Sequence, residues 1–186
     1  DDAILASKEL DLTLTGRNCG KEERAPMCGV PYHSCDSYIQ RLIKKGYKVA
    51  ICEQMEDPAT TKGMVKREVI RVVTPGTLIE SNMLDAGSNN FICSIYLEKG
   101  SYGLSFADIS TGEIYLTQME EDDNRVINEL GRFAPSEVIY NSAFFGKKEV
   151  AKFLKEKIGC TAEMLGDEVF AQEAATALTL RHFHKT

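Results

Sequence analysis

The residues best placed for chemistry are four basic side chains that lie close together in the first half of the chain. Lys62, Lys66, Arg67 and Arg71 are opposed within their stretch by Glu68 alone, which leaves a local net charge of +3. A patch of this size can hold a few phosphate groups, because lysine and arginine neutralise phosphate without reading base sequence. A run of charge is also commonly a solvated face, so both interpretations stay open at this point.

The cysteines offer little chemistry. The chain has no Cys-x-x-Cys pair, and the nearest approach to a ligand cluster, formed by Cys28, His33 and Cys35, lacks a fourth partner. Cys52 and Cys93 fall inside apolar runs, where a free thiol behaves as a small hydrophobic side chain. We therefore expect reduced thiols, no metal site and a cytoplasmic protein.

Enzymatic chemistry has one candidate centre. Asp108 ends a predicted strand, with Glu113 and Asp85 as distant carboxylates, and clustered carboxylates can hold the metal ions of a nuclease. Asp108 also stands before Ile-Ser-Thr-Gly, where an aspartate more often binds the backbone donors of a turn. The chain contains neither Gly-x4-Gly-Lys-Ser/Thr nor Gly-x-Ser-x-Gly. We expect no catalytic residue, and a metal-dependent nuclease remains the alternative.

The first half of the chain predicts two helices and three strands. Helices are expected over residues 2–10 and 34–45, the second capped by Ser34 and ended by Gly46. The strands are expected in chain order at 12–14, at 47–53 as a buried strand, and at 65–73 as a half-exposed strand. The polar, glycine-bearing stretch 16–26 predicts a loop.

The second half has a different order of elements. Three strands separated by hairpin-sized connections are followed by alternating helices and strands. The expected ranges are strands 91–97, 102–109 and 113–119, helix 123–133, strand 136–140, helix 147–158, strand 160–165 and helix 168–183. This order is typical of an RNase H-like domain, although several α/β folds share it.

A domain boundary is expected after Thr74-Pro75-Gly76-Thr77, which strongly interrupts regular structure. We place a first domain at 1–80, a linker at 81–90 and a second domain at 91–186. The formal net charge of −6 argues against a protein coated in basic surface, and all of the excess acid lies beyond residue 80. No apolar run has the length of a membrane helix, and the opening Asp1 suggests a piece of a longer protein.

The stretch 26–77 carries a specific resemblance. It reads PMCGVPYHSCDSYIQRLIKKGYKVAICEQMEDPATTKGMVKREVIRVVTPGT. This sequence closely resembles the mismatch-recognition domain of the bacterial MutS family of DNA mismatch-repair proteins. Residues 1–15 resemble the segment just upstream in that family. Residues 88–186, with FADISTGE and PSEVIY, resemble the start of the family's connector domain more diffusely.

The resemblance implies a fold and a function. The fold is α/β: a mixed-sheet recognition module followed by an RNase H-like (ribonuclease H motif) connector, here incomplete. The function is binding of mismatched double-stranded DNA by a MutS homodimer, whose ATP and Mg²⁺ site lies in a domain outside this chain. A Phe-x-Glu pair that stacks on the mispaired base is expected a few residues before Asp1.

The resemblance also implies which residues meet DNA. Arg17 and Arg67 match backbone contacts of the family, and Met27 matches an apolar residue beside the kinked step. Lys62 and Lys66 are added on electrostatic grounds. A third possibility is that the acidic second half docks a MutL-type repair protein, through the run Glu120-Glu121-Asp122-Asp123.

Overall fold

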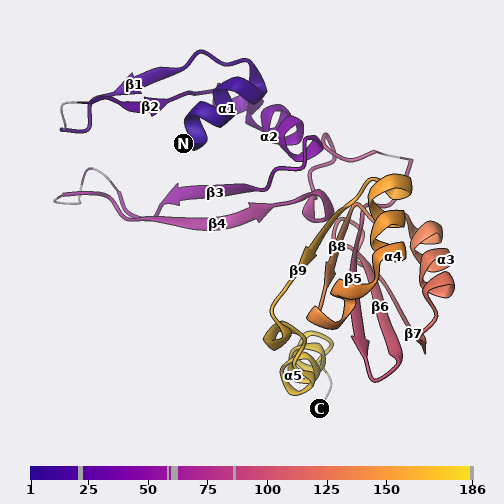
Figure 1. Ribbon diagram of the computed structural model, residues 1–186. Helices are drawn as coiled ribbons and strands as arrows, with labels where there is room; N and C mark the ends of the chain where they lie inside the picture. Colours follow the sequence, from indigo (N-terminus) through magenta and orange to yellow (C-terminus); the bar gives the residue numbers. More distant parts are fainter. Residues whose placement is uncertain (21–22, 58, 60–62, 86, 185–186) are drawn as a thin grey trace. The chain divides into compact units, whose positions relative to one another are not determined.

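The computed structural model describes residues 1–20, 23–57, 59, 63–85 and 87–184. The chain divides into two compact units, Asp1–Pro75 (unit 1) and Gly76–Thr186 (unit 2). Both units combine helices with β-structure, so the α/β class is confirmed (Figure 1). Within the described ranges, every helix is too short or too polar to span a bilayer.

Unit 1 is built on two helices, α1 (Asp2–Leu10) and α2 (Cys35–Lys44). Helix α1 buries Leu10, and α2 buries Ile39 and Ile43, which lie four residues apart on one helical face. A 3-10 turn over Tyr32–Ser34 leads into α2, and Gly46 follows its end with a φ of 86°. Ser34 was expected to cap α2, but its hydroxyl donates to the carbonyl of Pro31 instead, at 3.1 Å.

Two antiparallel ribbons complete unit 1. Strands β1 (Thr15–Arg17) and β2 (Ala25–Met27) form the first, and β3 (Val49–Gln54) and β4 (Arg67–Val73) form the second. The strand expected at 12–14 and the loop expected over 16–26 are therefore wrong in their boundaries. The ladder forms a few residues later, because the partner strand at 25–27 decides which residues pair.

The strand expected to be buried at 47–53 is also corrected. It exists as β3, but four of its six residues are exposed, Cys52 among them. The reason is that β3 belongs to a two-stranded ribbon, so it lacks the second layer that an apolar strand of a larger sheet buries itself against.

Unit 2 is a five-stranded sheet in the order β7-β6-β5-β8-β9. Its strands are β5 (Phe91–Glu98), β6 (Ser101–Asp108), β7 (Glu113–Glu120), β8 (Glu137–Tyr140) and β9 (Thr161–Met164). The first three form an antiparallel meander, and β8 and β9 add in parallel beside β5. Strict alternation of buried and half-buried residues along β5 and β6 defines the two faces of this sheet.

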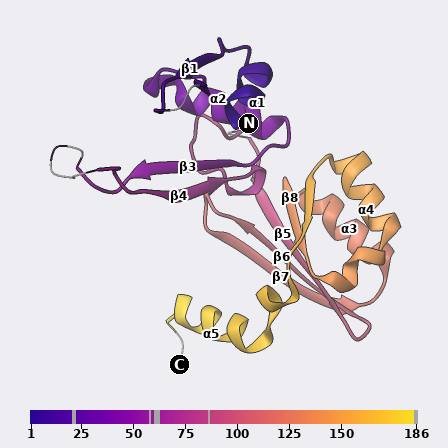
Figure 2. The same cartoon turned by 60° about the vertical axis from the view of Figure 1, so that its left-hand side comes forward.

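One face of the sheet is packed against α3 (Asp123–Phe133) and α4 (Lys148–Phe153), as Figures 1 and 2 show. Alternate residues of β5 and β6 meet Val126 and Leu130 of α3 and Val150 of α4 in one hydrophobic core. The helix expected at 147–158 is thus α4, continued by a π-helical turn over Leu154–Ile158.

The opposite face of the sheet carries the last elements. The helix expected at 168–183 is divided at Ala171 into a 3-10 turn (Asp167–Phe170) and α5 (Gln172–His182). Tyr96 of β5 stacks on Phe170, with ring centroids 5.8 Å apart. This contact holds the 3-10 turn against the sheet, while α5 itself buries no residue.

Candidate nucleic-acid interface

The β1–β2 hairpin presents Arg17 and Met27 on a single face. In the ladder Thr15 lies opposite Met27 and Arg17 lies opposite Ala25. Directly opposed residues share a face, as do residues two apart on one strand, so Arg17 and Met27 are diagonal neighbours. Arg17 is exposed, and Met27 keeps 43% of its surface accessible. A cation and an apolar tip thus stand side by side in solvent.

The hairpin is held by side chains as well as by its short ladder. The Thr15 hydroxyl donates to the carbonyl of Met27 at 2.9 Å, and the Arg24 guanidinium donates to the carbonyl of Gly16. Three paired residues on each strand are few for a hairpin in water, so these two bonds matter for its shape. Arg24 is a residue that the sequence interpretation did not single out, although its charge within a polar segment was visible.

The β3–β4 ribbon carries the second pair of predicted contact residues, Lys66 and Arg67, and both of these are basic. Arg67 begins β4 opposite Gln54, and Lys66 directly precedes it. The amide of Met55 donates to the carbonyl of Lys66 at 2.9 Å, and the amide of Lys66 donates to the carboxylate of Glu56 at 3.3 Å. The backbone at Lys66 is therefore fixed from both sides. Lys62, the remaining predicted contact, lies outside the described residues.

Acidic side chains lie beside the basic pair of the β3–β4 ribbon. The Lys66 ammonium lies 2.5 Å from the Glu68 carboxylate, and both side chains remain about half exposed or more. Glu53 lies opposite Glu68 in the ladder, so two carboxylates flank the basic pair. An anionic ligand that approaches Lys66 must therefore compete with Glu68.

The structure brings the predicted residues together as two pairs, one on each ribbon of unit 1. In Figure 1 both ribbons leave the helices toward the same side. A long exposed ribbon with basic side chains suits contact along an extended polyanion better than enclosure of a small molecule. The β3–β4 loop also holds Met64, which is 98% exposed and which the sequence interpretation did not name.

A metal-dependent nuclease would require Asp108 as a metal ligand. Asp108 instead accepts hydrogen bonds from neighbouring residues of the turn and from Asn90. Its carboxylate accepts hydrogen bonds from the amide and hydroxyl of Ser110, at 2.9 and 2.6 Å, and from the amide of Asn90 at 2.9 Å. Only 2% of Asp108 is exposed. Across the described residues, no group of three His, Cys, Asp or Glu side chains is arranged to hold a metal ion. This geometry gives the nuclease alternative no support.

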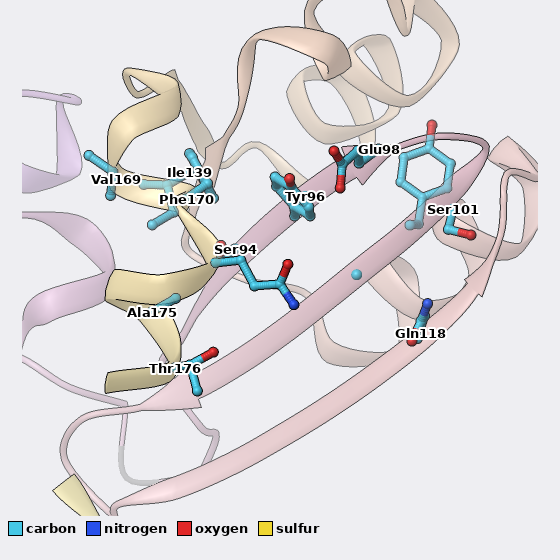
Figure 3. A pocket seen from close by; sticks show the side chains of 13 residues that line it. Ser94, Tyr96, Glu98, Ser101, Gln118, Ile139, Val169, Phe170, Ala175 and Thr176 are labelled. Carbon is cyan, nitrogen blue, oxygen red and sulfur yellow. The ribbon is translucent and has the colours of Figure 1, made fainter. Parts of the chain in front are cut away.

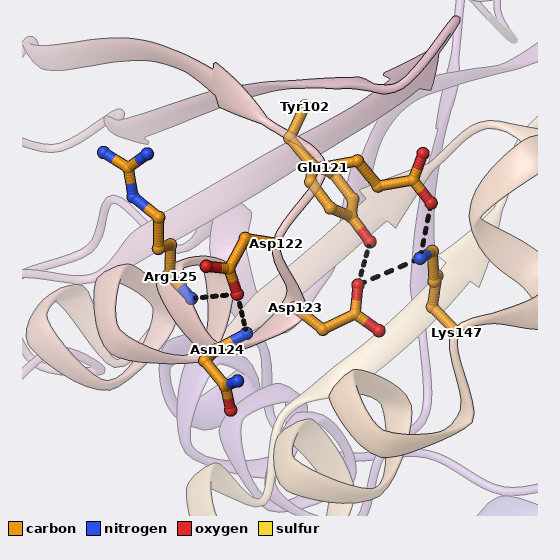
Figure 4. A network of polar contacts seen from close by, with 7 residues as sticks. All are labelled: Tyr102, Glu121, Asp122, Asp123, Asn124, Arg125 and Lys147. Atoms are coloured by element: carbon orange, nitrogen blue, oxygen red, sulfur yellow. Dashed lines mark hydrogen bonds and ion pairs between the residues drawn. The ribbon is translucent and has the colours of Figure 1, made fainter.

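The acidic run 120–123 is largely used inside unit 2 (Figure 4). Asp122 caps α3 by accepting from the amides of Asn124 and Arg125. Asp123 accepts from the Tyr102 hydroxyl at 2.8 Å and lies 3.0 Å from the Lys147 ammonium. Glu121 binds the same ammonium at 2.7 Å. Glu121 and Asp123 therefore hold the β7–α3 junction to the start of α4, while Asp122 caps α3.

The titration of this network follows from its contacts. Hydrogen bonds to Glu121 and Asp123 raise the pKa of Lys147, so the ammonium stays charged. Burial first, and then the hydrogen bond to Asp123, raises the pKa of Tyr102. Burial alone would raise the pKa of Asp123, but the bonds from Lys147 and Tyr102 outweigh it and lower that pKa. The network is a closed structural unit rather than an open acidic patch.

A hollow of about 640 Å³ lies between the second face of the sheet and the segment formed by the 3-10 turn Asp167–Phe170 and α5 (Figure 3). Tyr96, Ile139 and Phe170 give it an apolar wall, and Gln118 and Thr176 add uncharged polar groups. Among the described residues that line it, Glu98 alone carries a charge. A single carboxylate beside hydroxyls and amides can bind polar groups, but it provides no nucleophile with an adjacent base.

The fold and the ribbons define a two-unit α/β protein that presents its basic side chains on exposed strands. Family comparison agrees with this division, because residues 1–82 match the model of MutS domain I and residues 90–186 match that of MutS domain II. The chain belongs to the MutS family. The resemblance expected from residues 26–77 is thereby confirmed.

Individual relatives support the same assignment, and each is named a DNA mismatch repair protein MutS. The relative from Acetivibrio thermocellus is 50% identical over 184 residues, covering 98% of this chain and 21% of the relative. The one from Caldicellulosiruptor saccharolyticus is 58% identical over 139 residues, covering 75% of this chain and 16% of the relative. The one from Clostridioides difficile is 53% identical over 148 residues, covering 80% and 15%. The chain thus spans about a fifth of the length of the curated relatives it matches.

Proposed function

We propose that this chain is the DNA-contacting and connector part of a mismatch-repair protein that binds mismatched double-stranded DNA. The observation that carries the proposal is the pairing of Arg17 with Met27 on one exposed hairpin face, together with Lys66 and Arg67 on the second ribbon. A mispaired step is easier to unstack and bend than a matched one, so selectivity comes largely from DNA deformability. Basic residues hold the flanking phosphates and set the register.

Each residue has a distinct proposed role. Arg17 and Arg67 bind phosphates, Met27 packs beside the kinked step, and Lys62 and Lys66 add long-range attraction. Apolar side chains at a kinked step are a recurrent device of proteins that enter the minor groove. The stacking Phe-x-Glu pair would precede Asp1 in the longer protein. Without it, these 186 residues alone should bind DNA weakly and without mismatch preference.

The second unit is proposed to be an RNase H-like connector. The order β7-β6-β5-β8-β9, with β6 alone running opposite to the others, supports this description. We propose the functional domains as 1–80 and 91–186, with 81–90 as linker. The chain itself is proposed to be non-enzymatic and without cofactor, and ATP and Mg²⁺ would be bound elsewhere in the longer protein.

The proposed partners follow from the family. They are a second copy in a MutS homodimer and a MutL-type repair protein that docks on the connector, in the bacterial cytoplasm. The acidic run is a poor test of that docking, since Glu121, Asp122 and Asp123 already have structural partners.

The test is the salt dependence of DNA binding by the full-length protein that carries this chain. Arg67→Ala and Arg17→Ala should weaken binding to matched and mismatched duplexes alike. Each should reduce the slope of log K against log salt by roughly 0.9, the value for one lost phosphate contact. Arg125→Ala is the matched control, because Arg125 is an exposed arginine of unit 2 whose amide, not its side chain, binds Asp122. A wild-type slope in both ribbon variants would contradict the proposal.

A further inference from the structure

The motif Thr74-Pro75-Gly76-Thr77 is not explained by DNA contact, and the structure gives it a partner. Strand β4, which begins at Arg67, ends at Val73. Three residues later the amide of Gly76 donates a hydrogen bond to Oε2 of Glu137, at 3.0 Å. Gly76 is the first residue of unit 2, and Glu137 lies 61 residues further along the chain, at the start of β8.

The contact lies where two neighbouring strands of the sheet begin. Glu137 and Ile92 are partners in the parallel ladder of β8 and β5. A Cβ atom on Gly76 would come within 2.8 Å of the Ile92 Cβ and 2.9 Å of the Glu137 Cβ. The backbone of Gly76 therefore rests directly on one register pair of two central strands. Any side chain at this position would push the amide away from the carboxylate.

The Glu137 carboxylate that accepts this bond is buried. Glu137 is 3% exposed, and a buried carboxylate is tolerated only where hydrogen bonds replace its lost water. A bond from an amide to a charged acceptor is stronger than one between neutral groups. Breaking it would remove one of the contacts that solvate the Glu137 carboxylate inside the protein, so opening of the bond costs free energy.

We propose that Glu137 is a positioning residue for DNA recognition, because it fixes the point where the DNA-contacting unit is tethered to the connector. Thr74 and Pro75 are the whole span between β4 and the anchored Gly76. An extended chain covers at most about 3.6 Å per residue, so the chain has little length between the end of β4 and the anchored amide. Glu137 thus holds the backbone three residues beyond the end of the strand that carries Arg67. The inference rests on the proposed function.

The experiment uses the full-length protein and compares Glu137→Ala with Glu137→Gln. The glutamine keeps a carbonyl oxygen that can accept the Gly76 amide, and the alanine does not. Amide exchange at Gly76 should accelerate by roughly 10- to 100-fold in Glu137→Ala and little in Glu137→Gln. The affinity for mismatched DNA should fall several-fold in the alanine variant only, with an unchanged salt slope because no phosphate contact is lost.

Two controls separate this inference from the proposed function. Asn141→Ala removes buried hydrogen bonds elsewhere in unit 2 and should leave DNA affinity unchanged, so general destabilisation cannot mimic the effect. Glu137→Asp, which keeps the charge on a shorter side chain, serves if the alanine variant does not fold, and should show intermediate losses. Wild-type exchange at Gly76, or faster exchange with wild-type affinity, would overturn the role of Glu137. Wild-type affinity and salt slope in Arg67→Ala and Arg17→Ala would instead overturn the proposed function.

Discussion

Asn141 binds the backbone of Leu97 with both ends of its carboxamide: its Oδ1 accepts from the Leu97 amide and its Nδ2 donates to the Leu97 carbonyl, each at 3.0 Å. Leu97 lies near the end of β5, and Asn141 directly follows β8, its parallel neighbour. Both residues are buried. The side chain thus continues the pairing of β5 with β8 for one step beyond the ladder.

Replacing Asn141 should therefore destabilise unit 2. Asn141→Ala leaves a buried amide and a buried carbonyl without partners, which costs about 2–4 kcal/mol in the free energy of unfolding. The measurement is hydrogen exchange of the β5 and β6 amides, which reports on unit 2 alone. Asn124→Ala, at an exposed position of α3, is the control and should change little. Equal protection in both variants would contradict the buried role of Asn141.

The acidic run should behave as a structural element when its charges are changed. Asp123→Ala removes the acceptor of Tyr102 and one of the two carboxylates on Lys147, so the thermal midpoint should fall. Asp122→Ala should lose about 1 kcal/mol, the usual value of an N-cap. Glu120→Lys, at the exposed end of β7, should be nearly neutral. Circular dichroism melts of the three variants check this order, and a large loss in Glu120→Lys would contradict it.

Acid should weaken unit 2 through Asp108. Burial by itself raises the pKa of Asp108, but hydrogen bonds from Ser110, Asn90 and Thr111 outweigh it and lower the pKa below its ordinary 3.8. In the unfolded chain the group takes up its proton first as pH falls. The stabilisation is therefore fully present well above pH 3.8 and is lost as pH falls through the folded pKa.

The test compares protection of the β5 and β6 amides near neutral pH and at the acid limit of folding. Asp108→Asn should make stability less dependent on pH over that range, because the titrating group is gone. Glu149→Gln, an exposed carboxylate on α4, is the matched control. If both variants lose stability with acid as steeply as the wild type, Asp108 does not carry the effect.

The extent to which sequence predicted this structure differs between the two units for a physical reason. Strands β5 and β6 alternate strictly between buried and half-buried residues, so their pattern was readable along the chain. The hairpin β1–β2 has three residues in each strand, including Gly16 and Pro26, and depends on pairing and on Arg24. The break before α5 was missed because Ala171 is itself a good helix former.

In the candidate site, too, features that are local in sequence were predictable and long-range contacts were not. Lys66 was singled out because its charge is local in sequence, and Arg17, Arg67 and Met27 came from the family resemblance. The bond between Gly76 and Glu137 joins residues 61 positions apart, and neither residue suggests the other before the fold is known. Contacts of this kind depend on strand order, which single-sequence patterns do not determine.

The ion pair between Lys66 and Glu68 predicts a variant that binds DNA more tightly, whereas the variants that lose a phosphate contact bind it more weakly. Glu68 forms an ion pair with Lys66 at 2.5 Å, and under the proposed function its charge would repel phosphates that approach Arg67. Glu68→Gln should therefore tighten DNA binding by the full-length protein, by about 2–5-fold at low salt, as expected for one exposed charge. The gain should shrink at high salt, where exposed charges are screened. Glu173→Gln, at an exposed position of α5, changes the net charge equally and should have no comparable effect. If Glu68→Gln binds DNA no better than Glu173→Gln at low salt, the β3–β4 ribbon does not face the phosphates.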